Sequence, residues 1–354
     1  MRGGWMHYRG CDPKSSFTRI GDRHKCLSPS RSPGFREEIM TYPTVGQIHR
    51  LSPKMDAVVA PDAQVQQLAE GFIWSEGPVW VRDGQYLVFS DVPGNIMYRW
   101  SQADGLSEFM NPSGYDGPPT DTLAEPGSNG LALDAAGDLL VCDHGNRALA
   151  KVDLKTRKKT LLVERYAGKR LNSPNDLAVA KDGAIYFTDP TYGLKGRNAS
   201  PLRELDFNGV YRLRPDGALD LIDAELTFPN GIALSPDQSR LYVSVSDPNG
   251  PKLWVYDLGP DGLPTSKALF FDMPPGQPNG LGMPDGMCLD TEGRLYATGA
   301  GGVLVITPEA ELIGVIDTGS AVANCAFGED GRTLFIASFH TLTRVRLKTT
   351  GLVW

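Results

Sequence analysis

The chain has 354 residues, of which 41% are apolar and 22% charged, and its formal net charge is −7, a balance typical of a globular protein. No apolar run approaches the ~18 residues that a membrane-spanning helix requires, and an acidic chain lacks the basic face that phosphate binding needs. The composition therefore excludes a membrane protein, disfavours nucleic acid as a partner, and favours small molecules and metal cations.

Residues 1–39 differ in composition from the rest of the chain. They contain eight Lys or Arg against four Asp or Glu, show no apolar periodicity, and lack the apolar stretch of about 7–15 residues that a secretory signal needs. We expect residues 1–40 to be a disordered extension or an over-long gene start with the true start at Met40, and residues 41–354 to form a single domain. Because no signal peptide is recognisable, we expect the cytoplasm rather than the periplasm.

One sequence phrase recurs six times after this segment. Each copy has a carboxylate or amide residue, usually followed by glycine, and then two alternating apolar strands around a polar turn, which is a hairpin pattern. The second residue of each copy falls at position 76, 129, 175, 230, 285 and 324, so successive copies lie 39 to 55 residues apart. Because one four-stranded blade needs about 40–50 residues, this period predicts β-propeller blades. The copies cover residues 75–91, 128–144, 174–190, 229–247, 284–300 and 323–339.

Further strand-like runs lie between the copies and predict the outer strands of each blade. We expect the third strands at 95–100, 148–154, 209–213, 252–258, 303–308 and 343–348, and the fourth at 106–110, 159–164, 218–223, 267–272 and 311–317. Residues 60–70 are expected to complete the last blade as its outer strand. The sequence thus predicts an all-β, six-bladed β-propeller with a central channel over residues 60–354; a β-sandwich of the same strands is the alternative.

The starts of the first strands carry the candidate chemistry. In a propeller the first strand of each blade lines the channel, so equivalent positions meet in a ring at one mouth. Oxygen donors without His or Cys favour a hard cation with 6–8 ligands, so we expect Ca²⁺ there, with Zn²⁺, Mg²⁺ or Mn²⁺ possible. Alternatively, these residues simply cap turns. The ring comprises Glu76, Asn129, Asn175, Asn230, Asp285 and Asn324.

The loops after the second strands return to the same mouth. They place His144, Arg147 and Tyr192 within reach of a ligand on the metal, whereas Asp189 is expected to pin its Pro-containing turn. A histidine in such a polar loop can also be merely exposed, so both interpretations of His144 stay open.

The chain also resembles the gluconolactonase and regucalcin (senescence marker protein) family of six-bladed propellers. The resemblance rests on WSEGPVW (74–80), SNGLALD (128–134), LVCDHGNR (140–147), RLNSPNDLAV (170–179), IYFTDPTYGL (185–194), FPNGIALSPD (228–237) and MPDGMCLD (283–290). It implies hydrolysis of a sugar lactone such as glucono-1,5-lactone with a divalent metal. Carried over by motif, it implies Glu76, Asn175, Asn230 and Asp285 as metal ligands, Asn129 as a position that contacts substrate or lies beside the metal, and Asp285 also as general base.

The working hypothesis is therefore metal-assisted lactone hydrolysis at the channel mouth. The metal would polarise the carbonyl, and water would attack with Asp285 or His144 taking its proton; Asn129, Arg147 and Tyr192 would bind substrate. The chain has no G-x-S-x-G elbow, so a serine nucleophile is not supported. The alternatives are a metal-dependent aryl esterase or organophosphatase propeller, and a non-catalytic calcium-binding propeller. A monomer or a dimer is expected.

Overall fold

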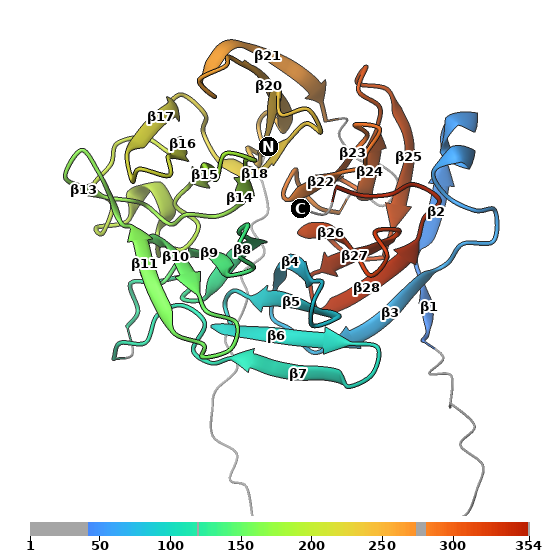
Figure 1. The fold of residues 1–354 in the computed structure, drawn as a ribbon, viewed down its shortest axis with the longest axis horizontal. Helices are drawn as coiled ribbons and strands as arrows, with labels where there is room; N and C mark the ends of the chain where they lie inside the picture. The colour runs from blue at the N-terminus through green and yellow to red at the C-terminus, as the bar shows by residue number, and fades with distance from the viewer. Residues whose placement is uncertain (1–41, 119, 274–280, 353–354) are drawn as a thin grey trace, which may run out of the picture. The chain divides into compact units, whose positions relative to one another are not determined.

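The computed structural model describes residues 42–118, 120–273 and 281–352. Along this part of the chain, six antiparallel sheets follow one another and are arranged radially around a centre (Figure 1). The predicted all-β six-bladed propeller is confirmed. The expectation for residues 1–40 concerns a segment outside the described residues. Within the described segments, no helix combines the length and apolar character needed to cross a bilayer.

The first four blades each contain four consecutive strands, with the innermost strand first. The predicted third and fourth strands therefore occur where the sequence places them. A small hairpin of β12 (Arg165–Tyr166) and β13 (Lys169–Arg170) follows the second blade. The blades are β4 (Ser75–Val81), β5 (Tyr86–Asp91), β6 (Ile96–Ser101) and β7 (Gly105–Met110); β8 (Ser128–Leu133), β9 (Leu139–Asp143), β10 (Ala148–Val152) and β11 (Lys159–Val163); β14 (Leu177–Val179), β15 (Ile185–Asp189), β16 (Gly209–Leu213) and β17 (Leu219–Asp223); and β18 (Pro229–Leu234), β19 (Arg240–Val245), β20 (Lys252–Leu258) and β21 (Pro264–Asp272).

The last two blades are completed by strands from the beginning of the described chain. β3 pairs with β28, which confirms that residues 60–70 supply the outer strand of the last blade. This pairing joins the two ends of the chain and closes the ring of blades. The pairing of β1 with β3 and of β2 with β25 adds a fifth strand to each sheet that the sequence did not predict. The strands are β1 (Thr44–Val45), β2 (Gln47–Arg50) and β3 (Val65–Glu70), with β22 (Met287–Leu289), β23 (Leu295–Gly299), β24 (Gly302–Ile306), β25 (Leu312–Asp317), β26 (Asn324–Gly328), β27 (Thr333–Ser338) and β28 (Thr341–Arg346).

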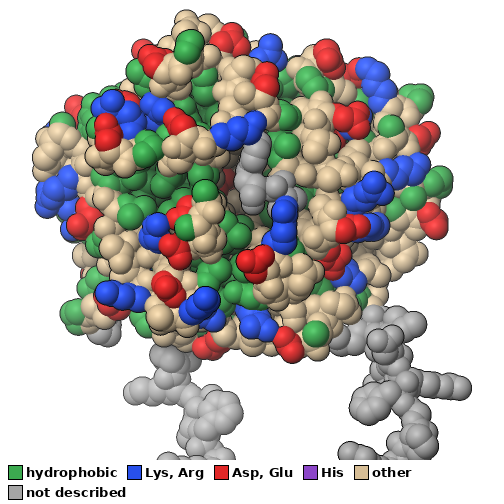
Figure 2. Space-filling view, in the orientation of Figure 1, with side chains coloured by type: hydrophobic (Ala, Val, Ile, Leu, Met, Phe, Trp, Pro, Cys, Tyr) green, Lys and Arg blue, Asp and Glu red, His purple; other side chains and the backbone are tan. Residues whose placement is uncertain are grey.

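The hydrophobic core lies between neighbouring blades. Alternation along each strand turns apolar side chains toward the adjacent sheet, as where Val88 of the first blade packs in one cluster with Val141 of the second. Trp80 stacks on Phe335 across the first and last blades, with ring centroids 5.4 Å apart. Fully burying one such side chain contributes about 1.5–3 kcal/mol. The outer surface is mixed, with acidic and basic side chains interspersed on the face drawn in Figure 2.

The glycine of the repeated phrase allows the innermost strands to approach one another. A Cβ at Gly77 would lie 2.2 Å from the carbonyl oxygen of Asn129, and a Cβ at Gly231 would lie 2.1 Å from that of Asp285. Both distances are far below van der Waals contact, so only glycine fits where two backbones pack this closely. The glycine recurs in the phrase because the innermost strands of neighbouring blades could not pack this closely with a larger residue.

Candidate active site

Five of the six ring residues line one cavity at the starts of the innermost strands. The cavity has a volume of about 560 Å³, within the range of small-molecule sites. Hydroxyl groups in the second strands fix the ring backbone, because Ser90, Thr188 and Ser244 each donate a hydrogen bond to the carbonyl of a ring residue in the next blade. The lining includes Glu76, Asn129, Asn175, Asn230 and Asp285, together with Trp74, Glu125, Tyr192, Arg197, Ser246 and Met283.

Glu76 in β4 is a buried carboxylate held by two donors. Its Oε2 accepts hydrogen bonds from the backbone N–H of Gly77 at 2.8 Å and from Nδ2 of Asn324 at 3.1 Å. Burial, followed by the charge of Glu125, raises the pKa of Glu76 to about 7. Asn324, the sixth ring residue, thus supports Glu76 from behind and does not line this cavity.

Asp285 lies beside Glu76, just before β22. The two carboxyl groups share a hydrogen bond. Loss of hydration raises the pKa of Asp285 well above its usual range, and the negative charges of Glu76, Asp176 and Glu125 raise it further. Without a cation, this part of the cavity therefore holds protons that ordinary carboxyl groups would release.

Two of the ring asparagines have partners for their amide nitrogens but none for their carbonyl oxygens. Asn230 in β18 donates from Nδ2 to Oγ of Ser246 at 2.9 Å, and Asn129 in β8 has its Nδ2 3.3 Å from Nε2 of His144. The Oδ1 atoms of Asn129 and Asn230 are buried and have no hydrogen-bond partner within the described chain. A buried polar atom without a partner costs about 1–3 kcal/mol, so these oxygens are suited to a ligand.

The donor set fits a hard divalent cation. Among the residues that the structure describes, no group of three or more His, Cys, Asp or Glu side chains is placed to hold an ion. The cavity instead combines the neighbouring carboxyl groups of Glu76 and Asp285, and that of Glu125, with asparagine amide groups. Oxygen donors of this kind suit Ca²⁺ and similar ions, and a divalent charge would relieve the repulsion that raises the pKa of Glu76 and Asp285.

The loop residues singled out in the sequence fall in different places. Tyr192 lines the cavity and stacks on Phe228, with ring centroids 5.7 Å apart. His144 is fully buried behind Asn129 and does not line the cavity. Arg147 is also buried and donates from Nε to the carbonyl oxygens of Leu171 at 2.8 Å and Asn172 at 3.1 Å. The structure therefore does not bring Arg147 into the cavity; its side chain holds the loop before Asn175.

Asp189 was expected to pin its own Pro-containing turn, but its side chain contacts the loop before Asn175 instead. Its Oδ2 accepts a hydrogen bond from the backbone N–H of Asn172 at 2.8 Å. The side chain is fully buried, and burial raises the pKa of Asp189 to about 7.

Several lining residues were not predicted from the sequence. Glu125 and Arg197 lie in connections of unequal length, which have no counterpart in the other repeats and carry no periodic signal. Trp74 and Met283 stand two residues before Glu76 and Asp285 in the chain. Trp74 and Met283 precede β4 and β22, so strand alternation does not place them; their shared offset of two residues from a ring position is a signal that could have found them.

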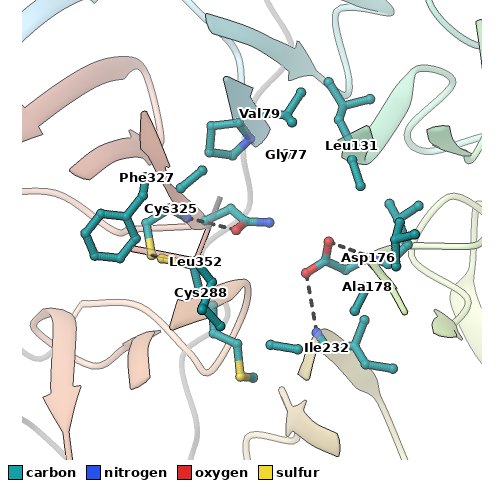
Figure 3. Close-up of a pocket in the computed structure, with 18 of the residues that line it drawn as sticks. Gly77, Val79, Leu131, Asp176, Ala178, Ile232, Cys288, Cys325, Phe327 and Leu352 are labelled. Atoms are coloured by element: carbon teal, nitrogen blue, oxygen red, sulfur yellow. Dashed lines mark hydrogen bonds between the residues drawn. The ribbon is translucent and has the colours of Figure 1, made fainter. Parts of the chain in front are cut away.

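A second cavity lies farther along the same innermost strands (Figure 3). Asp176 faces it and accepts hydrogen bonds from the backbone N–H groups of Leu177 at 2.9 Å and Ile232 at 3.4 Å. Burial and then the charge of Glu76 raise the pKa of Asp176 to about 8. The sulfur atoms of Cys288 and Cys325 are 3.6 Å apart on the opposite wall. This second cavity is mostly apolar and has a volume of about 180 Å³.

Comparison with known proteins identifies the family. Residues 74–340 match the model of the SMP-30/gluconolactonase/LRE-like region. The chain is 47% identical to a gluconolactonase of Zymomonas mobilis over 99% of this chain and 100% of that protein. It is 24% identical to a pentonolactonase of Haloferax volcanii over 67% of this chain and 70% of that protein.

A solved structure agrees with these sequence matches. The structure of a gluconolactonase from Xanthomonas campestris superposes with a TM-score of 0.75 at 34% identity, covering 88% of this chain and 99% of that one. Together with the match over residues 74–340, this shows that the chain belongs to the SMP-30/gluconolactonase/LRE-like family.

Proposed function

We propose that the protein is a lactonase that opens a sugar lactone of the glucono-1,5-lactone type to the aldonic acid. The observation that carries the proposal is the convergence of three carboxylates and three asparagines on one cavity of about 560 Å³. Whole-chain similarity to a gluconolactonase, at 47% identity, supports it. A cavity of this size accommodates a sugar ring and water.

The oxygen atoms of Glu76, Asn175, Asn230 and Asp285 would hold a divalent cation. Ca²⁺ is the first choice because it accepts six to eight oxygen ligands, and Zn²⁺, Mg²⁺ or Mn²⁺ are the alternatives. When bound, such an ion supplies Lewis-acid polarisation of the lactone carbonyl. The two carboxylates match its charge.

Asp285 is the proposed general base. Its side chain lines the cavity beside Glu76, and a cation held next to it would keep the carboxyl group ionised and able to accept a proton from water. Water adds to the lactone carbonyl carbon while Asp285 accepts one proton from it. The ring C–O bond then breaks, the departing ring oxygen takes that proton and becomes a hydroxyl group, and the new carboxylic acid ionises at neutral pH. One proton is released per turnover.

Other lining residues would bind the sugar. Asn129 offers Oδ1 as an acceptor for a substrate hydroxyl group, and Tyr192 lines the same cavity with a ring held by Phe228. Trp74 contributes an apolar surface that suits the C–H face of a sugar ring. This division into polar and apolar walls supports a sugar-derived substrate.

The test is proton release from glucono-1,5-lactone, followed with a pH indicator and corrected for spontaneous hydrolysis. The purified full chain is assayed after EDTA treatment and after adding back Ca²⁺, Mg²⁺, Mn²⁺ or Zn²⁺. We expect turnover that is lost in Asp285→Asn and unchanged in Glu225→Gln, whose side chain is 88% exposed. A folded protein that does not hydrolyse the lactone with any of these ions would refute the proposal. Turnover of an aryl ester or a fluorophosphate instead would support the esterase alternative, and ion binding without turnover would support a non-catalytic propeller.

A further inference from the structure

His144 connects two residues of the cavity wall without lining the cavity itself. It follows β9, and its side chain is fully buried. Nδ1 lies 3.2 Å from Oε2 of Glu125, a close charge contact whose geometry is not that of a hydrogen bond. Nε2 lies 3.3 Å from Nδ2 of Asn129. Glu125 and Asn129 both line the cavity. The imidazole therefore stands behind the site, between a carboxylate and an amide.

The carboxylate selects the tautomer of the imidazole. A carboxylate beside Nδ1 favours the proton on that nitrogen, which leaves Nε2 of a neutral ring as an acceptor. Nε2 then accepts from the amide N–H of Asn129. The amide nitrogen of Asn129 is thereby used behind the wall, and its Oδ1 is buried without a hydrogen-bond partner in the described segments.

Asn230 shows the same arrangement with a simpler partner. Oγ of Ser246 donates its single proton to the carbonyl oxygen of Pro284, so it can only accept from Nδ2 of Asn230, at 2.9 Å. Oδ1 of Asn230 is likewise buried without a partner among the described residues. In both asparagines, an acceptor contacts the amide nitrogen; His144 does so from behind the wall, whereas Ser246 is partly buried and itself lines the cavity.

The surroundings hold the imidazole in place. A Cβ at Gly193 would lie 2.9 Å from Cβ and 3.0 Å from Cγ of His144, so the backbone of residue 193 packs directly on the histidine. The backbone N–H of His144 donates to the carbonyl of Gly127 at 3.2 Å. A ring so enclosed has little freedom to rotate away from Asn129.

We infer that His144, oriented by Glu125, is a positioning residue that fixes the amide of Asn129 with Oδ1 toward a substrate hydroxyl group. The inference deepens the proposed lactonase function and rests on it. It assigns His144 a role through Asn129 in place of proton transfer. If the amide turned over, the cavity would present an N–H donor where the substrate needs an acceptor.

Two substitutions at His144 separate positioning from proton transfer. His144→Leu removes the acceptor and should lower kcat/KM by roughly 10–100-fold, as for other outer-sphere partners, with a rise in KM. His144→Gln can return an acceptor oxygen near Asn129 and should recover most of the loss. His49→Leu, on the outer strand β2, is the matched control and should leave kcat/KM unchanged. If the kcat/KM of His144→Gln is as low as that of His144→Leu, the positioning role is overturned.

A double-mutant cycle tests whether the effect passes through Asn129. We expect His144→Leu to cost almost nothing further in an Asn129→Leu background, because the group that it orients is already absent. If the fold-loss in kcat/KM of the double variant equals the product of the two single losses, the inference is overturned. Thermal unfolding of each variant identifies any that fail to fold; for these the cycle is repeated with His144→Ala and Asn129→Ala.

The tautomer itself is measurable without turnover. In ¹⁵N-histidine-labelled protein, the signal that disappears in His144→Gln should show a protonated Nδ1 and an unprotonated Nε2. Protonation at Nε2 instead would overturn the inference even in an active enzyme. Conversely, absence of lactone turnover in the wild type would refute the proposed function while leaving the tautomer result intact, so the two failures are distinguishable.

Discussion

Replacing Glu76 by Gln should stabilise the cation-free protein while abolishing its activity. Glu76 is 2% exposed, and burial followed by the charge of Glu125 raises its pKa from 4.5 to about 7. Between these two pH values the folded state binds more protons than the unfolded state. The free energy of unfolding therefore falls as pH rises from about 4.5 through 7.

The magnitude follows from the shift in the pKa of Glu76. From 4.5 to about 7, at 1.36 kcal/mol for each pKa unit, the loss of stability above pH 7 is about 3 kcal/mol. Gln avoids this loss because it carries no charge, and its amide oxygen can still accept from Gly77 and Asn324. For a domain of this size, the gain corresponds to roughly 5 °C in Tm.

Thermal unfolding in EDTA at pH 5 and pH 8 measures the effect. Glu76→Gln should melt above the wild type at pH 8, with the difference largely gone at pH 5, and Glu225→Gln should follow the wild type at both. Adding Ca²⁺ at pH 8 should raise the Tm of the wild type and leave that of Glu76→Gln nearly unchanged. A variant less stable than the wild type in EDTA at pH 8, or equally stabilised at both pH values, would refute the reasoning.

Three further outcomes follow from the same structure. Gly231→Ala places a Cβ 2.1 Å from the carbonyl oxygen of Asp285 and should lower the free energy of unfolding by at least about 1–3 kcal/mol; a denaturant titration that matches the wild type would contradict the close packing. Ser246→Ala removes the acceptor that orients Asn230 and should lower kcat/KM by roughly 10-fold, whereas an unchanged value in a lactone assay would show that the amide is held by other means. Asp189, with its pKa raised by burial to about 7, makes the wild type lose stability as pH rises from about 4 through 7; Asp189→Asn should flatten this dependence of Tm on pH, and an equally steep decline would count against it.

Much of the propeller follows from the repeated phrase, because strand alternation and turn chemistry are local properties of the chain. The closing strand β3 was predicted because its apolar run alternates as the others do. The short strands β1 and β2 were not, since they have two and four residues and no clear alternation. They form because unpaired edges of β3 and β25 are available next to them.

The sequence positions of the ring residues were predictable, but the contacts that their side chains make were not. The repeat places Asn324 at the same point of its blade as the other ring residues, yet its amide is used by Glu76. That difference depends on side-chain rotamers and on the neighbouring blade. The spacing of residues in the sequence indicates neither the rotamer of Asn324 nor its neighbours in the next blade.

The loops after the second strands were the hardest part to interpret. His144 and Arg147 belong to a polar sequence that suggests exposure near a ligand, but both are buried and support the loops around the cavity. Arg147 has a backbone φ of 57°, a left-handed conformation that a sequence pattern does not indicate for arginine. Burial of these polar side chains depends on partners from distant segments, such as Glu125 and Leu171.

The most direct measurement titrates Ca²⁺ into the EDTA-treated protein while recording both ion binding by calorimetry and hydrolysis of glucono-1,5-lactone. We expect binding and activity to saturate together at one ion per chain, and Glu76→Gln to lose both while remaining folded. Full activity in EDTA, or Ca²⁺ binding that Glu76→Gln leaves unchanged, would contradict this expectation.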